Sequence, residues 1–334
     1  MNGLLSLTVP ELEKIITDLG EKKFAARQLR AWLVKGALFD DMTNLSKPLR
    51  EKLKERYSEG YARIQKKLTS IDGTVKYLLE MTDGNLIECV VMDYHHGRTL
   101  CVSTQVGCRM GCVFCASGLD GLVRQLTAGE MLSEVIAARE SGEISNVVLM
   151  GSGEPLDNYD NVIEFLNALQ SEFGIGQRHI SLSTCGLVPG ILKLSEEQLS
   201  ITLCISLHAA IDEKRKKLMP VARAYTISEI MNAANVYFKK TGRRIIIEYT
   251  LIRGFNDGQE DIEALKNVLT GLNCHINVIP INHAAGEFAP PSKSESYAFA
   301  AALERIGLGA TVRRALGSDI EGACGQLKRR TGQL

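Results

Sequence analysis

Residues 108–115 read Cys108-Arg109-Met110-Gly111-Cys112-Val113-Phe114-Cys115, three cysteines spaced C-x3-C-x2-C in one short loop. Three thiolates from one loop can hold an iron–sulfur cluster, whereas a cluster of four irons ordinarily takes four protein ligands. One iron would then be open to another ligand, which marks a site for chemistry rather than for structure. The alternatives are a zinc site and three ordinary buried cysteines. Zinc favours paired C-x2-C units, and the chain has no second one.

The chain has 334 residues, enough for one large domain with one or two appendages. Its formal net charge is zero, but the charge is unevenly distributed. Residues 1–70 carry 14 Lys and Arg against 9 Asp and Glu, a net charge of +5. This basic part fits a surface that contacts phosphates, and it fits equally a helical domain with solvated charged faces.

The sequence shows no sign of secretion or of a membrane span. Nine cysteines in a chain that opens without a basic, apolar leader favour reduced thiols or a cofactor over a disulfide framework. No stretch approaches the roughly 18 apolar residues that a membrane helix needs. We therefore expect a cytoplasmic protein with no membrane partner.

Two changes of pattern divide the chain. Residues 1–60 show helical periodicity and capping signals, which predict a small helical domain. Residues 61–97 contain two apolar runs around the turn Asp83-Gly84-Asn85, which predict a short β hairpin extension. Residues 310–334 contain one further candidate strand and a Gly-rich tail.

Between residues 98 and 309, strand-like runs alternate with helices, which is typical of βα units and a parallel sheet. Thr127-Ala128-Gly129-Glu130 and Thr226-Ile227-Ser228-Glu229 are capping boxes that open two of the helices. The predicted strands span residues 101–105, 146–150, 180–184, 203–207, 244–251 and 276–281. The expected fold is α/β, a partial (β/α)6 barrel similar to the TIM barrel.

In such folds the working groups lie on the loops at the carboxyl ends of the strands. The three cysteines follow the first predicted strand, and Gly151-Ser152-Gly153-Glu154-Pro155 follows the second. Glycines there let the backbone approach a ligand closely, and a carboxylate beside them can receive an ammonium group. Alone, this motif could be a tight turn.

Four stretches resemble the RlmN/Cfr family of radical S-adenosylmethionine RNA methyltransferases. They are residues 101–108 (CVSTQVGC), 150–155 (MGSGEP), 206–208 (SLH) and 319–327 (DIEGACGQL). The resemblance implies a barrel of the radical S-adenosylmethionine type, with the N-terminal helical domain contacting RNA. Pro155 and Val106 favour the RlmN branch, because the Cfr branch usually has Ala and Cys there.

The resemblance implies methylation of carbon-2 of an adenosine in 23S rRNA, and in tRNA next to the anticodon. Cys108, Cys112 and Cys115 would hold a 4Fe-4S cluster, whose open iron binds S-adenosylmethionine and yields a 5′-deoxyadenosyl radical. Each turnover would consume two S-adenosylmethionine molecules, with flavodoxin or ferredoxin as electron donor. A monomer is expected.

The resemblance also assigns roles to three residues outside the cysteine loop. Cys324 would carry a methyl group, which the radical activates, so that enzyme and RNA become joined covalently. Cys101 would remove the carbon-2 proton and resolve the adduct through a transient disulfide with Cys324. Glu88, an acid in an otherwise apolar run, would be a proton acceptor. From its sequence context alone, Glu88 is either solvent-facing on an edge strand or partly buried with a functional task.

By the same matching, several residues at successive strand ends would contact S-adenosylmethionine: Gly153, Glu154, Ser183, Ser206, Leu207, His208 and Asn282. Each alone is more often a turn former or a core residue. Four other cysteines are expected to be core residues: Cys89, Cys185, Cys204 and Cys274. A basic C-terminal group could hold RNA phosphates or be a solvated tail: Arg313, Arg314, Lys328, Arg329 and Arg330.

Three other functions stay open at this point. A Cfr-type enzyme would methylate carbon-8 of an adenosine in 23S rRNA and confer antibiotic resistance. A non-catalytic RNA-binding protein would use the cluster only as a structural staple, which leaves Cys101 and Cys324 unexplained. A radical enzyme acting on a small molecule or a protein would not need a basic helical appendage.

Overall fold

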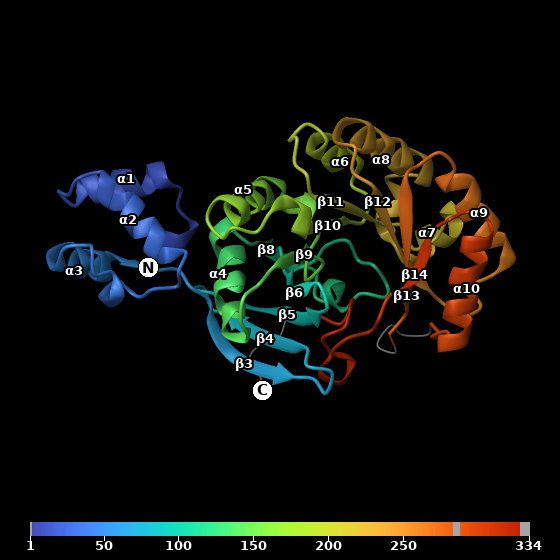
Figure 1. Cartoon of the computed structure of the whole chain (residues 1–334), viewed down its shortest axis with the longest axis horizontal. Helices are drawn as coiled ribbons and strands as arrows, with labels where there is room; N and C mark the ends of the chain where they lie inside the picture. Colours follow the sequence, from blue (N-terminus) through green and yellow to red (C-terminus); the bar gives the residue numbers. More distant parts are fainter. Residues whose placement is uncertain (1, 283–287, 328–334) are drawn as a thin grey trace.

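The computed structural model describes residues 2–282 and 288–327, and its centre is a sheet of ten strands (Figure 1). From one edge to the other the strands are β14 (Ala310–Val312), β13 (Cys274–Pro280), β12 (Ile245–Leu251), β11 (Thr202–Ser206), β10 (Ile180–Thr184), β9 (Asn146–Leu149), β6 (Gly97–Val102), β5 (Leu86–Tyr94), β4 (Val75–Glu80) and β3 (Arg63–Thr69). Pairing is parallel from β14 to β6 and antiparallel from β6 to β3.

Helices follow the parallel strands and cover one face of the sheet. They are α4 (Ala128–Ala138), α5 (Tyr159–Ser171), α6 (Val188–Leu194), α7 (Asp212–Leu218), α8 (Ile227–Thr241), α9 (Gln259–Leu269) and α10 (Lys293–Arg305). Both predicted capping boxes are present: the Glu130 and Glu229 carboxylates accept from the backbone N–H groups of Thr127 and Thr226. None of the described helices is long and apolar enough to cross a membrane. The predicted α/β class with a mostly parallel sheet is confirmed.

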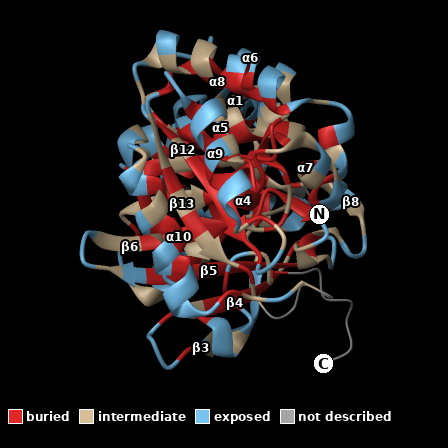
Figure 2. Ribbon diagram, turned by 90° about the vertical axis from the view of Figure 1, so that its right-hand side faces the viewer, coloured by how far each residue is buried: buried red, intermediate tan, exposed pale blue. Residues whose placement is uncertain are grey.

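The two faces of the parallel sheet differ in chemistry, because successive side chains of a strand point to opposite sides. The face toward the helices is apolar: Leu149, Leu182 and Leu203 are at most 1% exposed and belong to the main core. Figure 2 shows this core as buried residues running through the strands. The other face carries polar groups in neighbouring register, such as Ser206 opposite Glu248. A polar inner face suits a ligand site rather than a packed core.

The hairpin around Asp83-Gly84-Asn85 is formed by β4 and β5. It continues the main sheet, because Val90 of β5 pairs with Cys101 of β6. The sequence did not predict β3, whose side chains are almost all exposed. Charged side chains along β3 protect this open edge from pairing with other chains.

The first predicted strand is wrong at its end, because β6 stops at Val102 and Gln105 belongs to the separate strand β7 (Gln105–Gly107). β7 pairs with β8 (Leu122–Gln125) in a two-stranded antiparallel sheet. β6 ends before Ser103, because the backbone N–H of Ser103 donates to the side-chain carboxylate of Glu134, 3.0 Å, and not to a neighbouring strand. The Ser103 hydroxyl donates to the Glu88 carbonyl, 2.7 Å.

The N-terminal helices α1 (Val9–Asp18), α2 (Phe24–Leu33) and α3 (Lys47–Arg56) lie beside α4 and α5 (Figure 1). Arg30 of α2 pairs with Glu172 just after α5, 2.8 Å. The Ser6 and Thr127 hydroxyls share a hydrogen bond of 2.9 Å. At this contact Gly129 leaves no room for a side chain, because a Cβ there would lie 2.4 Å from the Ser6 backbone.

This contact gives a prediction for Gly129→Ala. Helix propensity alone would favour alanine by about 1 kcal/mol, but pushing two backbones apart costs roughly 1–3 kcal/mol. We expect faster cleavage of residues 1–60 in limited proteolysis. Gly176→Ala is the control, because its Cβ would meet only an ordinary contact of 3.6 Å. Wild-type resistance of Gly129→Ala would show that the two parts are not closely packed.

Candidate active site

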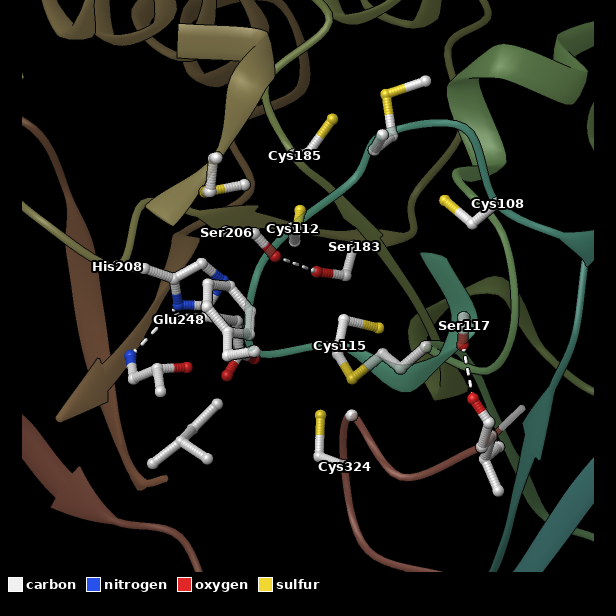
Figure 3. A pocket seen from close by; sticks show the side chains of 18 of the residues that line it. Cys108, Cys112, Cys115, Ser117, Ser183, Cys185, Ser206, His208, Glu248 and Cys324 are labelled. Atoms are coloured by element: carbon white, nitrogen blue, oxygen red, sulfur yellow. Dashed lines mark hydrogen bonds between the residues drawn. The ribbon is translucent and has the colours of Figure 1, made fainter. Parts of the chain in front are cut away.

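A cavity of about 990 Å³ of empty volume opens where the parallel strands end (Figure 3). Polar inner-face residues of four different strands or strand ends contribute to its wall: Ser183, Ser206, Glu248, Thr250 and Arg313. The cavity therefore collects side chains that are far apart in the sequence.

Cys108, Cys112 and Cys115 all line this cavity. Burial raises the pKa of Cys108 to about 11, so a metal would have to displace its proton. Among the described residues, no three His, Cys, Asp or Glu side chains meet closely enough to hold one metal ion. Ligands of a multi-iron cluster bind different irons and need not converge on one point. Three thiols from one short loop that lines the cavity are thus candidate ligands of such a cluster.

Gly153 and Glu154, just after β9, also line the cavity. Gly153 has a φ of +107°, and a Cβ there would lie 2.6 Å from Cβ of Gln105, so this turn requires glycine. The Glu154 carboxylate accepts from the backbone N–H groups of Cys185 (2.7 Å) and Leu156 (3.1 Å). Burial raises the pKa of Glu154, and the hydrogen bonds oppose this effect. Cys185, expected to be a core residue, lines the cavity.

His208 lines the cavity, and its side chain is held by a hydrogen bond and a ring contact. Its Nδ1 accepts from the Thr250 N–H, 3.0 Å, and its ring packs edge-to-face on Phe114, with centroids 4.7 Å apart. Burial, reinforced by Arg215, lowers the pKa of His208 to about 3, so its ring is neutral. His208 therefore supports the aromatic residue that precedes Cys115.

Ser183 and Ser206 come together on the cavity wall, with their hydroxyls 3.2 Å apart. Asn282 also lines the cavity, and its amide donates to the Cys324 carbonyl, 2.8 Å. Leu207 does not reach the cavity with its side chain, which is fully buried. Its carbonyl accepts from the guanidinium of Arg215, 3.1 Å. Among the residues predicted to contact S-adenosylmethionine, Leu207 is thus the one whose side chain does not line the cavity.

Sequence reasoning missed two charged residues of the site. Glu248 is 3% exposed, and its Oε2 has no hydrogen-bond partner in the described structure. Burial raises its pKa, and Arg313, 3.8 Å away, opposes this. The sequence grouped Arg313 with basic residues that could hold RNA phosphates or form a solvated tail, whereas in the structure Arg313 lines the cavity. An acid in the apolar run Ile245–Leu251 was the signal that could have revealed Glu248.

Arg215 is a third residue that sequence reasoning missed, and it does not itself line the cavity. It is fully buried and donates to the carbonyls of Leu207 and Cys185 (2.6 Å). These carbonyls belong to the loops after β11 and β10, so one guanidinium ties the two loops together. Nothing in its surrounding sequence distinguishes Arg215 from a solvated helical arginine.

The segment after β14 brings Cys324 to the cavity, with its side chain pointing inward (Figure 3). Two hydrogen bonds fix it to the cysteine loop: Ala116 N–H to the Gly325 carbonyl, 2.8 Å, and the Ser117 hydroxyl to the Leu327 carbonyl, 2.6 Å. Although Cys324 is an exposed residue, surrounding protein desolvates its thiol and raises its pKa, which Arg313 opposes. Lys328, Arg329 and Arg330 lie outside the described residues.

Cys101 does not line the cavity. It is 8% exposed and lies in an apolar cluster with Met92, Leu316 and Leu327. Burial raises the pKa of Cys101 to about 12; the nearby Cys324 thiol adds to the effect and Arg313 opposes it. All nine cysteines are free thiols in this structure. The predicted disulfide between Cys101 and Cys324 is thus not formed here.

Glu88 is buried rather than solvent-facing, 2% exposed, and it does not line the cavity. Its carboxylate pairs with Lys76, 3.2 Å away and equally buried. Glu88 lies two residues from Val90, the partner of Cys101, and therefore shares the sheet face of Cys101.

The residues present fit a cluster with S-adenosylmethionine. Three thiols of one loop, side chains of the kind that bind iron in such clusters, line the cavity, and the turn at Gly153 brings backbone close to it. The Oε2 of Glu248, which accepts no hydrogen bond in the described structure, and the paired serine hydroxyls offer hydrogen bonds to a polar ligand. Cys108, Cys112 and Cys115 would hold the cluster.

Comparison with known proteins agrees with this geometry. Residues 102–267 match the Radical SAM superfamily, and residues 2–58 match the ribosomal RNA large subunit methyltransferase N-terminal domain. Two relatives are each described as a probable dual-specificity RNA methyltransferase RlmN. The protein of Alkaliphilus oremlandii is 53% identical and that of Clostridium perfringens is 51% identical, each over 98% of this chain and 97% of the relative.

A crystal structure of a radical SAM methyltransferase from Sphaerobacter thermophilus superposes with a TM-score of 0.93 at 41% identity. The match covers 98% of this chain and 99% of that one. Sequence and fold thus agree with these relatives over nearly the whole length of the chain. The chain belongs to the RlmN family of radical SAM methyltransferases.

Proposed function

We propose that this protein is an RNA methyltransferase that modifies carbon-2 of an adenosine in 23S rRNA, and of an adenosine in tRNA next to the anticodon. One observation carries the proposal. Cys324, more than 200 residues away in the sequence, shares a cavity wall with Cys108, Cys112 and Cys115. A non-catalytic protein with a structural cluster would not need a fourth thiol there.

The cluster, when bound, supplies the electron that cleaves S-adenosylmethionine to a 5′-deoxyadenosyl radical. Cys324 first accepts a methyl group at its sulfur and releases its proton to solvent. Its S-methyl group would then give a hydrogen atom to the 5′-deoxyadenosyl radical, which becomes 5′-deoxyadenosine, and the methylene carbon would bond to the adenine ring. Two S-adenosylmethionine molecules are used, and a flavodoxin or ferredoxin provides the electron.

Cys101 would complete the reaction after the radical adduct has passed one electron back to the cluster, which the cleavage of S-adenosylmethionine leaves oxidised. It removes the carbon-2 proton and then bonds to the Cys324 sulfur, which breaks the bond from Cys324 to the RNA. The disulfide formed is reduced before the next turnover. Because burial raises the pKa of Cys101 to about 12, bound RNA must change its surroundings before a thiolate forms. In this proposal Glu88, which shares the sheet face of Cys101, is the proton acceptor.

The N-terminal helices supply a surface for RNA. Lys22, Lys23 and Arg27 are exposed at the start of α2, and phosphate contacts dominate the affinity for nucleic acids. The protein acts as a monomer in this proposal, and the reaction takes place in the cytoplasm, where its RNA substrates are made.

The first test identifies the modified base. RNA lacking the modification is incubated with the reconstituted enzyme, S-adenosylmethionine and a reductant, and its nucleosides are separated by mass spectrometry. We expect 2-methyladenosine, because Pro155 and Val106 match the RlmN branch. The appearance of 8-methyladenosine would show that the enzyme belongs functionally with the Cfr branch.

A second test concerns pH. Since desolvation raises the pKa of Cys324 above its ordinary value, its thiolate fraction is small at neutral pH. Below the pKa, the thiolate fraction grows about tenfold for each pH unit. The initial rate at which Cys324 takes up labelled methyl groups should therefore rise steeply between pH 7 and 8.5. A flat profile would mean that the thiolate of Cys324 is already formed at pH 7. Cys324→Ala, which lacks the thiol that takes up the label, is the blank.

A third test reverses charge on the N-terminal surface. We expect the triple variant with Lys22→Glu, Lys23→Glu and Arg27→Glu to bind RNA roughly tenfold more weakly, with a smaller salt dependence. Lys239→Glu with Lys266→Glu is the control, because these exposed residues of α8 and α9 lie far from the N-terminal helices (Figure 1). Equal losses in both variants would mean that the effect is general electrostatics.

A further inference from the structure

The turn between β3 and β4 grips the segment that leads to Cys324. The Asp319 carboxylate accepts from the Ser70 hydroxyl and, at 3.1 Å, from the Ile71 N–H. In the opposite direction, the Gly317 N–H donates to the Asp72 carboxylate, 2.8 Å. The two elements are about 245 residues apart in sequence, so these bonds are tertiary contacts and not local turn geometry.

A third contact lies deeper in the same region. The ammonium group of Lys76, 2% exposed, donates to the Glu321 carbonyl, 3.1 Å. Glu321 has a left-handed backbone with a φ of +53°, which costs free energy for a residue other than glycine. Such a conformation persists only where surrounding contacts enforce it. Lys76 also pairs with Glu88, so the buried pair is connected to the backbone three residues before Cys324.

Cys324 therefore lies between two sets of contacts. On one side are four hydrogen bonds, three with the β3–β4 turn and one with Lys76 of β4, and each involves a charged group. On the other side the carbonyls of Cys324, Gly325 and Leu327 accept from Asn282, Ala116 and Ser117. Hydrogen bonds to ionised groups are roughly twice as strong as neutral ones. The side at the β3–β4 turn is consequently the firmer anchor.

Both carboxylates are ionised around neutral pH. The hydrogen bonds from Ser70 and Ile71 lower the pKa of Asp319. Burial alone would raise the pKa of Asp72, but the bonds from Gly317 and Thr74 outweigh it and hold the pKa at about 2. The anchor therefore does not depend on pH in the range where the enzyme works.

We propose that Ser70, Asp72, Lys76 and Asp319 are positioning residues that hold the Cys324 segment so that its thiol faces the cluster cavity. This inference rests on the proposed function, because it assigns these residues to the methyl-carrying cysteine. It also gives the buried pair of Lys76 and Glu88 a task in placing Cys324, in addition to any proton transfer.

Asp319→Ala tests the proposal in the holoenzyme. The rate of methyl transfer to Cys324 should fall roughly ten- to a hundredfold, because small misplacements of reacting groups cost that much. Cluster absorbance and the affinity for S-adenosylmethionine should stay within twofold of wild type, a split that general destabilisation would not produce. Ser318→Ala is the matched control. Ser318 is the exposed neighbour of Asp319, and it takes part in the described structure through its backbone carbonyl, which accepts from the Glu321 N–H.

A second readout does not need methyl transfer. Both proteins are prepared from iron-starved cells, so that Cys324 is an unmethylated thiol, and the cluster is then reconstituted. Iodoacetamide should alkylate Cys324 of Asp319→Ala severalfold faster than Cys324 of wild type, and the Gly322 amide, which donates to the Gly317 carbonyl, should exchange its hydrogen faster. If Asp319→Ala does not fold, Ser70→Ala removes a single donor and carries the same test with a smaller effect. Wild-type rates of methyl transfer and alkylation in the folded variant would overturn the inference. An unmethylated Cys324 in the wild type would instead contradict the proposed function.

Discussion

The structure depends on one constraint of parallel sheets: all carboxyl ends of the strands lie at the same edge. Loops after β6, β9, β10 and β11 therefore meet around one cavity, whatever their distance in sequence. The sheet is open, with β14 at one edge and β3 at the other. The segment after β14 crosses to the β3–β4 turn, which is how Cys324 reaches the cluster loop.

Opposing electrostatic effects decide the state of the site. Burial raises the pKa of the Cys101 thiol to about 12 and that of the Cys108 thiol to about 11. Arg313 opposes this at Cys101 and Cys324, but its charge is shared with Glu248. The thiols are therefore protonated in this state, and reactivity must come from bound metal, cofactor or RNA.

Much of the fold was predictable, because the signals were local. The alternating strands and helices predicted β9 to β13 to within two residues at each end, and the capping boxes at Thr127 and Thr226 located two helices. The early end of β6 was not predictable, since Ser103 is bound by Glu134 and Glu88, which are distant in sequence. For the same reason β3 was missed: its residues are exposed and show no apolar alternation.

The site was predictable where a motif names the residue, as at Cys108 or Gly153, and less so where packing decides. Arg215, Glu248 and Arg313 take their roles from partners on other strands, which a single sequence does not reveal. The most direct measurement is peptide mapping by mass spectrometry of the protein from cells replete in iron and S-adenosylmethionine. The account predicts one methyl group on the sulfur of Cys324. A homogeneous unmodified thiol at Cys324 would contradict it.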